Sequence, residues 1–276
     1  MQTFYISKKI NFLSEGVDKQ NLIISVCEKI KAYMLNHNYI EANSEDDKID
    51  FVFSVGGDGT MIHTMNEFLN KDSVVIGINA GNVGFLTPYT IEDVFNEDVF
   101  SFIHNESYRI EDRSILQYEY NGKIVNSVNE YAFTSNHPNY TIDFNISIQN
   151  KGHTSKAGHY KSNTLLISGP CGSTAYNMNA GGSIIDPSVS VMQILLVAPT
   201  TLGIRPMIIN SNSKIILRPA SQIEVFTDGF SSDIIEPYST ITISMKEKQS
   251  KLLVPDNWNF YSVLSKKLLW NNGRDV

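Results

Sequence analysis

Hydrophobic and polar residues in the first hundred positions follow two alternating patterns. Continuous apolar runs, typical of buried strands, cover residues 2–6, 51–55 and 74–78. Elsewhere, at about residues 21–36 and again after residue 60, apolar residues recur every three or four positions, which predicts amphipathic helices. Strands that are apolar throughout and alternate with helices indicate a parallel sheet covered on both faces. We therefore expect a doubly wound α/β domain.

The pattern changes near residue 105. An Asn121-Gly122 pair joins two strand-like segments and is a strong hairpin signal, and residues 140–148 alternate between apolar and polar side chains. These features predict a mainly antiparallel β-sandwich. Further strands are expected at residues 164–168, 194–198, 206–209, 214–217, 222–227 and 240–245.

Further patterns refine this division. The patterns place an α/β domain at residues 1–104 and a β-rich domain at residues 105–255. A helical repeat near the end of the chain predicts that residues 256–276 pack back on the first domain. Thr90 and Asp93 have the spacing of a capping box, and we expect the helix they open to continue to about His104. Another helix is expected at residues 174–180.

Composition narrows the classes of partner. The 276 residues carry 22 Lys and Arg against 29 Asp and Glu, a net charge of -7, so nucleic acid is a poor expectation for the main partner. Cys27 and Cys171 are too few for a disulfide framework. The first residues of the sequence lack a signal-peptide pattern, and no apolar segment approaches the roughly 20 residues that a membrane-spanning helix needs. We expect a cytoplasmic protein without a membrane partner.

The strongest chemical signal is the motif GGDGT at residues 56–60, placed between a strand and a helix. Such a turn presents backbone N–H groups and a helix N-terminus to phosphate. Asp58 stands in the middle of it, and its carboxylate would repel phosphate, so it needs another task, such as holding a hydroxyl, a proton or a metal ion. A second glycine turn, residues 81–84, also follows a strand and should reach the same sheet edge.

Further motifs follow in the β region. They are Asn129-Glu130 at an expected strand end, GSTAY at residues 172–176, AGG at residues 180–182 and the turn Asp228-Gly229. Together with GGDGT and GNVGFLT at residues 81–87, this ordered set resembles that of NAD kinases over about residues 50–230. The resemblance implies a Rossmann-like, phosphofructokinase-like α/β domain joined to a β-sandwich. It also implies phosphorylation of the 2′-hydroxyl on the adenosine ribose of NAD to give NADP.

The resemblance also assigns roles. Asp58 would be the catalytic base, and a divalent ion, Mg²⁺ or Mn²⁺, would be carried with ATP. NAD and ATP, or polyphosphate, would be the ligands, and the chain would form a homodimer or homotetramer. The phosphate- and nucleotide-binding residues would be Gly56, Gly57, Gly59, Thr60, Gly81, Asn82 and Phe85. The NAD-binding residues would be Asn129, Glu130, Lys161, Asn163, Thr174, Ala175, Tyr176, Asn179 and Asp228.

Several positions depart from the family pattern. Asn82 replaces a histidine, Gly169 and Cys171 alter the loop before GSTAY, and Asn163 replaces an aspartate. These changes touch substrate-binding loops and leave Asp58 intact. Two alternatives stay open, the first because of these departures and the second because related GGDGT turns occur in diacylglycerol kinases. One is a catalytically weak sensor that binds NAD(H) or NADP(H), and the other is a lipid or diacylglycerol-type kinase.

Overall fold

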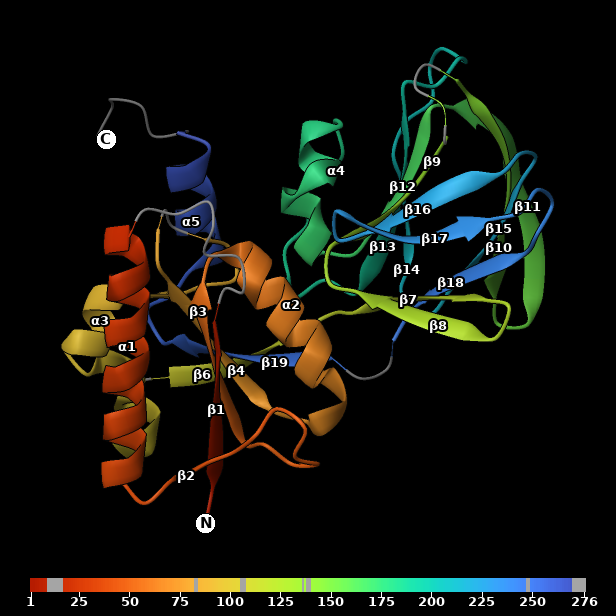
Figure 1. Cartoon of the computed structure of the whole chain (residues 1–276). Coiled ribbons are helices and arrows are strands. Elements are labelled where there is room, and N and C mark those ends of the chain that lie inside the picture. Colours follow the sequence, from red (N-terminus) through yellow and green to blue (C-terminus); the bar gives the residue numbers. More distant parts are fainter. Residues whose placement is uncertain are drawn as a thin grey trace. The chain divides into compact units, whose positions relative to one another are not determined.

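The structure is a computed structural model, and it describes residues 1–8, 17–81, 84–104, 108–135, 137, 140–246 and 249–269. The chain divides into two compact units, one of residues 1–112 with 250–276 and one of residues 113–249. Figure 1 labels the elements of both units. No helix in the described ranges is long and apolar enough to cross a membrane.

The first unit is built on a sheet whose strands run in the order β2-β1-β3-β4-β19-β6, with β5 beside β4. The pairs β1–β2, β1–β3, β3–β4, β4–β5 and β4–β19 are parallel. Its elements are β1 (Thr3–Lys8), α1 (Val17–Asn36), β2 (Ile40–Glu41), β3 (Phe51–Gly56), α2 (Asp58–Phe68), η2 (Leu69–Lys71), β4 (Val74–Asn79), β5 (Tyr89–Thr90), α3 (Ile91–Phe95), η3 (Asp98–His104), β6 (Tyr108–Arg113), β19 (Ser250–Pro255) and α5 (Phe260–Lys267).

Helices cover both faces of this sheet, as the apolar strands predicted. On one face, Ile23 and Ile30 of α1 pack with Phe53 of β3 in a buried cluster. On the other face, the next residue of β3, Val52, packs with Phe68 of α2. Adjacent strand residues point to opposite faces, so this division follows directly from the continuous apolar run.

The second unit is an antiparallel sandwich. Its described residues form two sheets, ordered β11-β10-β15-β18-β7-β8 and β14-β13-β12-β9-β16-β17, whose inner faces share one buried core. The elements are β7 (Leu116–Tyr120), β8 (Lys123–Ser127), β9 (Glu130–Ser135), β10 (Ile142–Asn150), β11 (His153–Ser162), β12 (Thr164–Ser168), η4 (Cys171–Thr174), α4 (Tyr176–Asn179), β13 (Val191–Val197), β14 (Met207–Asn210), β15 (Lys214–Pro219), β16 (Ile223–Thr227), β17 (Phe230–Ile235) and β18 (Ile241–Met245).

The expected hairpin turn at Asn121-Gly122 is confirmed. Both residues have positive φ, 50° and 76°, as a two-residue turn matching the strand twist requires. Asp228-Gly229 repeats this geometry with φ of 50° and 86° between β16 and β17. These short turns fix which residues of each strand face the core.

Two helix predictions were wrong in extent. The capping box at Thr90 and Asp93 is present, but α3 ends at Phe95 because Glu97 takes a left-handed conformation with φ of 70°, and η3 follows. The expected helix at residues 174–180 is split, because Ala175 (φ −100°, ψ −132°) leaves the helical region between η4 and α4. In both places one residue's backbone conformation interrupts an otherwise helical pattern.

Strands β6 and β19 belong to the first sheet, so the first unit extends past both expected boundaries, 104/105 and 255/256. The boundaries of the domains as functional modules stay predictions. Helix α5 lies in the first unit and contacts the loop after β4 through Phe260, whose ring centroid is 6.0 Å from that of Phe85.

Candidate active site

The GGDGT motif forms the turn between β3 and α2. Gly56 closes β3, and a Cβ there would lie 2.3 Å from the hydroxyl oxygen of Thr60, so the turn itself requires glycine. A Cβ at Gly57 or Gly59 would meet no atom within 4 Å. The space beside those two glycines is therefore open, as a phosphate cradle at a helix N-terminus needs.

Asp58 is the first residue of α2, and its carboxylate is held by the loop that follows β4. The N–H groups of Phe85 and Leu86 donate to it at 2.9 and 3.0 Å, and the Thr87 hydroxyl lies 3.4 Å away. Gly84 is required here, since a Cβ would lie 2.1 Å from Asp58 Oδ1. The two glycine turns predicted from sequence therefore meet through Asp58.

A cluster of buried hydroxyl groups links the elements on either side of the GGDGT turn. The Thr64 hydroxyl lies 2.9 Å from both the Ser7 hydroxyl and the carbonyl of Thr60, and 3.0 Å from the Ser54 hydroxyl. All three side chains are buried. They connect β1, β3 and α2, and so fix the position of the α2 N-terminus relative to the ends of the two strands.

The loop after β4 is anchored by Asn79. Its side-chain oxygen accepts the N–H of Gly81 at 2.7 Å, and its amide donates to Thr87 at 2.9 Å. The predicted site residue Asn82 lies outside the described residues. Asn79 was not among the predicted site residues, although its place at a strand end beside a glycine turn is a usable signal.

In the second unit, Asp228 organises the predicted Asn129-Glu130 pair. Asn129 precedes β9, and Glu130 is the first residue of that strand. The Asp228 carboxylate accepts the Ser127 hydroxyl and the Asn129 N–H, both at 2.7 Å, and the Val128 N–H at 3.0 Å. Its turn is thus more than a hairpin connection. The carboxylate fixes the path of the segment that enters β9.

Glu130 is the most unusual acid of this unit. It is only 6% exposed, and its Oε2 atom has no hydrogen-bond partner among the described residues. Burial, with a smaller contribution from the Asp228 charge, raises the pKa of Glu130 to about 8, against an opposing hydrogen bond from the backbone of Tyr176. A buried carboxyl with an unpartnered oxygen is suited to receive a polar ligand.

Glu130 and Tyr176 line a cavity of about 340 Å³, and Tyr176 is 44% exposed, so its ring is available to a flat ligand. The other lining residues, which were not among the predicted site residues, are Ala132, Thr134, Thr164, Phe226 and Gly229. They come from β9, β12 and the region around the β16–β17 turn, where only Gly229 belongs to a motif, the turn Asp228-Gly229.

The family follows from comparison with known proteins. Models of the ATP-NAD kinase N-terminal and C-terminal domains match residues 14–106 and 100–254. This chain belongs to the NAD kinase family. An NAD kinase from Pasteurella multocida (strain Pm70) is 33% identical, covering 86% of this chain and 79% of that protein. An NAD kinase from Buchnera aphidicola subsp. Baizongia pistaciae (strain Bp) is 33% identical, covering 91% and 87%.

Two solved structures of the family share the fold. A yeast NADH kinase complexed with NADH has a TM-score of 0.81 at 18% identity, covering 100% of this chain and 89% of that one. An NAD kinase from Archaeoglobus fulgidus in complex with ATP has a TM-score of 0.76 at 21% identity, covering 98% and 99%. The likeness extends over both units described above.

The remaining residues expected from the NAD kinase resemblance do not line the cavity at Glu130. Asn163 donates to the carbonyl of Tyr140 and accepts the Thr164 hydroxyl, and Thr174 donates to the carbonyl of Cys171. Lys161 lies 4.0 Å from Asp143 on an exposed strand. The roles of Ala175 and Asn179 are not tested by these contacts. All of these assignments stay predictions.

Proposed function

We propose that this chain is an ATP-dependent NAD kinase that transfers a phosphoryl group to the 2′-hydroxyl on the adenosine ribose of NAD, forming NADP. The observation that carries the proposal is Asp58, an acid fixed by two backbone N–H groups at the head of α2, beside glycines that leave room for phosphate. The motif order and the family membership support the same reaction.

ATP would bind at the first unit. Its phosphate oxygens would accept hydrogen bonds from the N–H groups of the turn at Gly57 and Gly59, where the helix N-terminus favours negative charge. In the described ranges, no three His, Cys, Asp or Glu side chains are grouped to hold a metal ion. We propose that Mg²⁺ or Mn²⁺ enters with ATP, because magnesium commonly binds substrate phosphates and keeps its waters. When bound, the ion would neutralise phosphate charge.

Asp58 would act on the acceptor hydroxyl. Its carboxylate would accept a hydrogen bond from the ribose 2′-hydroxyl, orient that oxygen toward the γ-phosphorus and take its proton as the new P–O bond forms. The amides of Phe85 and Leu86 prevent rotation of the carboxylate. This restraint lets a side chain on a surface turn hold one productive orientation.

The second unit would hold NAD. We propose that Tyr176 stacks on the adenine, that the Glu130 carboxyl binds ribose hydroxyls, and that Asn129 and Thr174 bind the adenine edge. The open cavity beside Tyr176 and the unpartnered Glu130 oxygen support these roles. A carboxyl whose pKa is about 8 is largely protonated near neutral pH, so Glu130 can donate as well as accept a hydrogen bond.

The family resemblance further supports a cytoplasmic homodimer or homotetramer, which we include in the proposal. Light scattering of the purified chain gives its mass in solution. A monomer at working concentrations would exclude that part of the proposal without affecting the reaction.

The test is NADP formation from NAD, ATP and magnesium by the purified chain and by the variant Asp58→Asn. We expect the variant to lose at least about 100-fold in kcat, because the amide cannot accept the proton. Asp47→Asn, which makes the same change at an exposed loop position, is the control and should match the wild type.

Three results would refute parts of the proposal. If Asp58→Asn keeps the kcat of the wild type, Asp58 is not the catalytic base. Calorimetric binding of NAD by the wild type without turnover would identify a sensor. Phosphorylation of diacylglycerol in preference to NAD would identify a lipid kinase.

A further inference from the structure

Helix α5, near the end of the chain, is firmly attached beside the phosphate turn. The Arg109 guanidinium group donates to the carbonyls of Asp256 and Trp258, at 2.5 and 2.6 Å, just before the helix. Asn259 caps the helix by accepting the N–H of Tyr261 at 2.8 Å. Phe260 is buried and packs toward Phe85. The helix therefore has a fixed place against the loop that holds Asp58.

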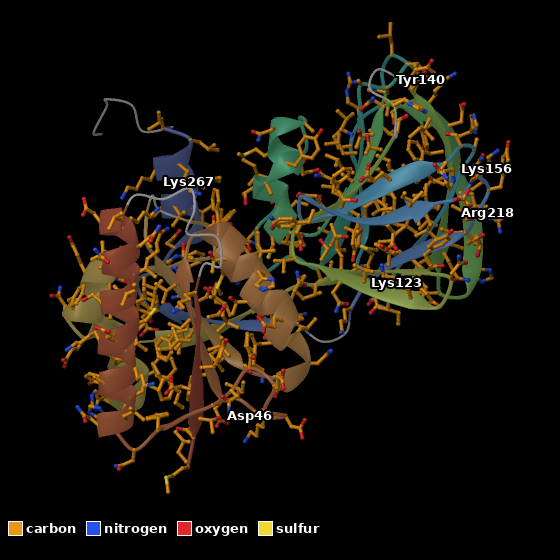
Figure 2. All side chains as sticks on the ribbon, viewed as in Figure 1. Asp46, Lys123, Tyr140, Lys156, Arg218 and Lys267 are labelled. Carbon is orange, nitrogen blue, oxygen red and sulfur yellow. The ribbon has the colours of Figure 1, made fainter. Side chains whose placement is uncertain are left out.

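Lys267, which lies in the last turn of α5 and is labelled in Figure 2, is close to the carboxylate of Asp58, the proposed catalytic base. Its Nζ lies 3.5 Å from Asp58 Oδ2 and 4.5 Å from the centroid of the Phe85 ring. The Phe85 N–H donates to the same Oδ2 atom at 2.9 Å, while the Leu86 N–H donates to Oδ1. Each carboxylate oxygen thus has an assigned donor, and Oδ2 also faces a cation.

The Lys267 ammonium group lies where it can offset the negative charge of Asp58. An ionised carboxylate inside a phosphate-binding turn repels the phosphates that the turn should bind. An ammonium group next to the carboxylate reduces that repulsion and can also attract phosphate oxygens. The side chains of Lys267 and Asp58 are 31% and 28% exposed, so both remain accessible to a ligand.

We propose that Lys267 is a positioning residue that fixes Asp58 and offsets its charge, so that the polyphosphate of ATP can bind beside it. This role rests on the proposed kinase function. The ring of Phe85 holds the ammonium group from one side by a cation–π contact, which limits its reach to the carboxylate and the open side of the turn. Helix α5 then contributes to the active site.

A packing role alone makes a different prediction. If Lys267 only attached α5, methionine would preserve its apolar stem and most of the function. An exposed ion pair adds little stability, so Lys267→Met should fold normally and report on charge. Lys266→Met is the matched control, since Lys266 is an exposed neighbour on the same helix turn.

The experiment measures the calorimetric Kd of magnesium-ATP, and kcat with the KM values for ATP and NAD, in the wild type, Lys267→Met, Lys267→Arg and Lys266→Met. We expect Lys267→Met to weaken ATP binding and lower kcat, each by about five- to tenfold, with KM for NAD changed less than about twofold. Lys267→Arg should recover to within about threefold of the wild type, because it restores the cation.

The outcomes separate this proposal from the function itself. If the wild type binds ATP but forms no NADP, the kinase function fails, and the binding series still decides the role of Lys267. An ATP Kd and a kcat of Lys267→Met that both match the control overturn the role. The same conclusion follows if arginine is as impaired as methionine, or if the wild type does not bind ATP.

Discussion

Replacing Glu130 with glutamine should remove a pH-dependent destabilisation of the second unit. Glutamine has nearly the same shape and stays neutral at every pH, whereas the glutamate must ionise in a buried place. The carboxyl is 6% exposed and faces the nearby charge of Asp228. The variant therefore isolates the cost of burying this one acid.

The magnitude follows from the pKa. Burial raises the pKa of Glu130 from 4.5 to about 8 in the native protein, while the unfolded chain keeps the ordinary value. Below about pH 4.5 both states carry the proton, and the site costs nothing. As the pH rises from about 4.5 to about 8, the unfolded state releases the proton first, so native stability falls. Between about pH 6 and pH 9 the wild type should lose about 2–3 kcal/mol that Glu130→Gln does not lose.

The assay is urea unfolding of both proteins at the two pH values, followed by circular dichroism near the β-sheet minimum, because the second unit is mainly strands. The difference between wild type and variant cancels the titration of all other groups to first order. Glu119→Gln is the control, because Glu119 is an exposed residue of β7 in the same unit. Parallel pH dependences of wild type and Glu130→Gln would refute the assigned burial and the reasoning built on it.

Two further substitutions test the supports of the site. Gly172→Ala places a Cβ 2.0 Å from the carbonyl oxygen of Asn129, so we expect a stability loss of about 1–3 kcal/mol and a raised KM for NAD. Gly169→Ala controls for glycine replacement, because its added Cβ would meet its nearest atoms at ordinary contact distances, 3.8 and 3.9 Å. Equal stability and equal NAD affinity in all three proteins would contradict this view. Thr64→Val keeps the side-chain volume but leaves the buried Ser7 and Ser54 hydroxyls without their Thr64 partner, so we expect the free energy of unfolding to fall by about 1–3 kcal/mol in thermal and urea unfolding. An unchanged unfolding midpoint would show that the cluster is dispensable.

The sequence was most informative where a local pattern determines local structure. The apolar runs located β3 and β4, and Asn-Gly and Asp-Gly pairs located tight turns, because positive φ at these positions is a property of the residues themselves. The α/β domain and the antiparallel sandwich could both be predicted in this way. The family's motif set added Asp58 and Glu130, which the structure places at the turn between β3 and α2 and beside a cavity.

Other features depend on contacts between distant parts of the chain. Asp58 accepts hydrogen bonds from backbone amides 27 and 28 residues away, and its ion-pair partner Lys267 comes from α5. The raised pKa of Glu130 requires the burial produced by a folded sheet and the charge of Asp228. No spacing along the sequence contains this information. The early end of α3 is a smaller case, decided by the backbone of Glu97 alone.

The placement of β19 between β4 and β6 has a consequence for protein synthesis. Strand β6 leaves the ribosome before the second unit, but its neighbour in the first sheet, β19, is made only after that unit is finished. The first sheet can therefore close only after the whole second unit has been synthesised, so the turn between β3 and α2 gains a complete sheet late, although β3 is among the first strands to be made.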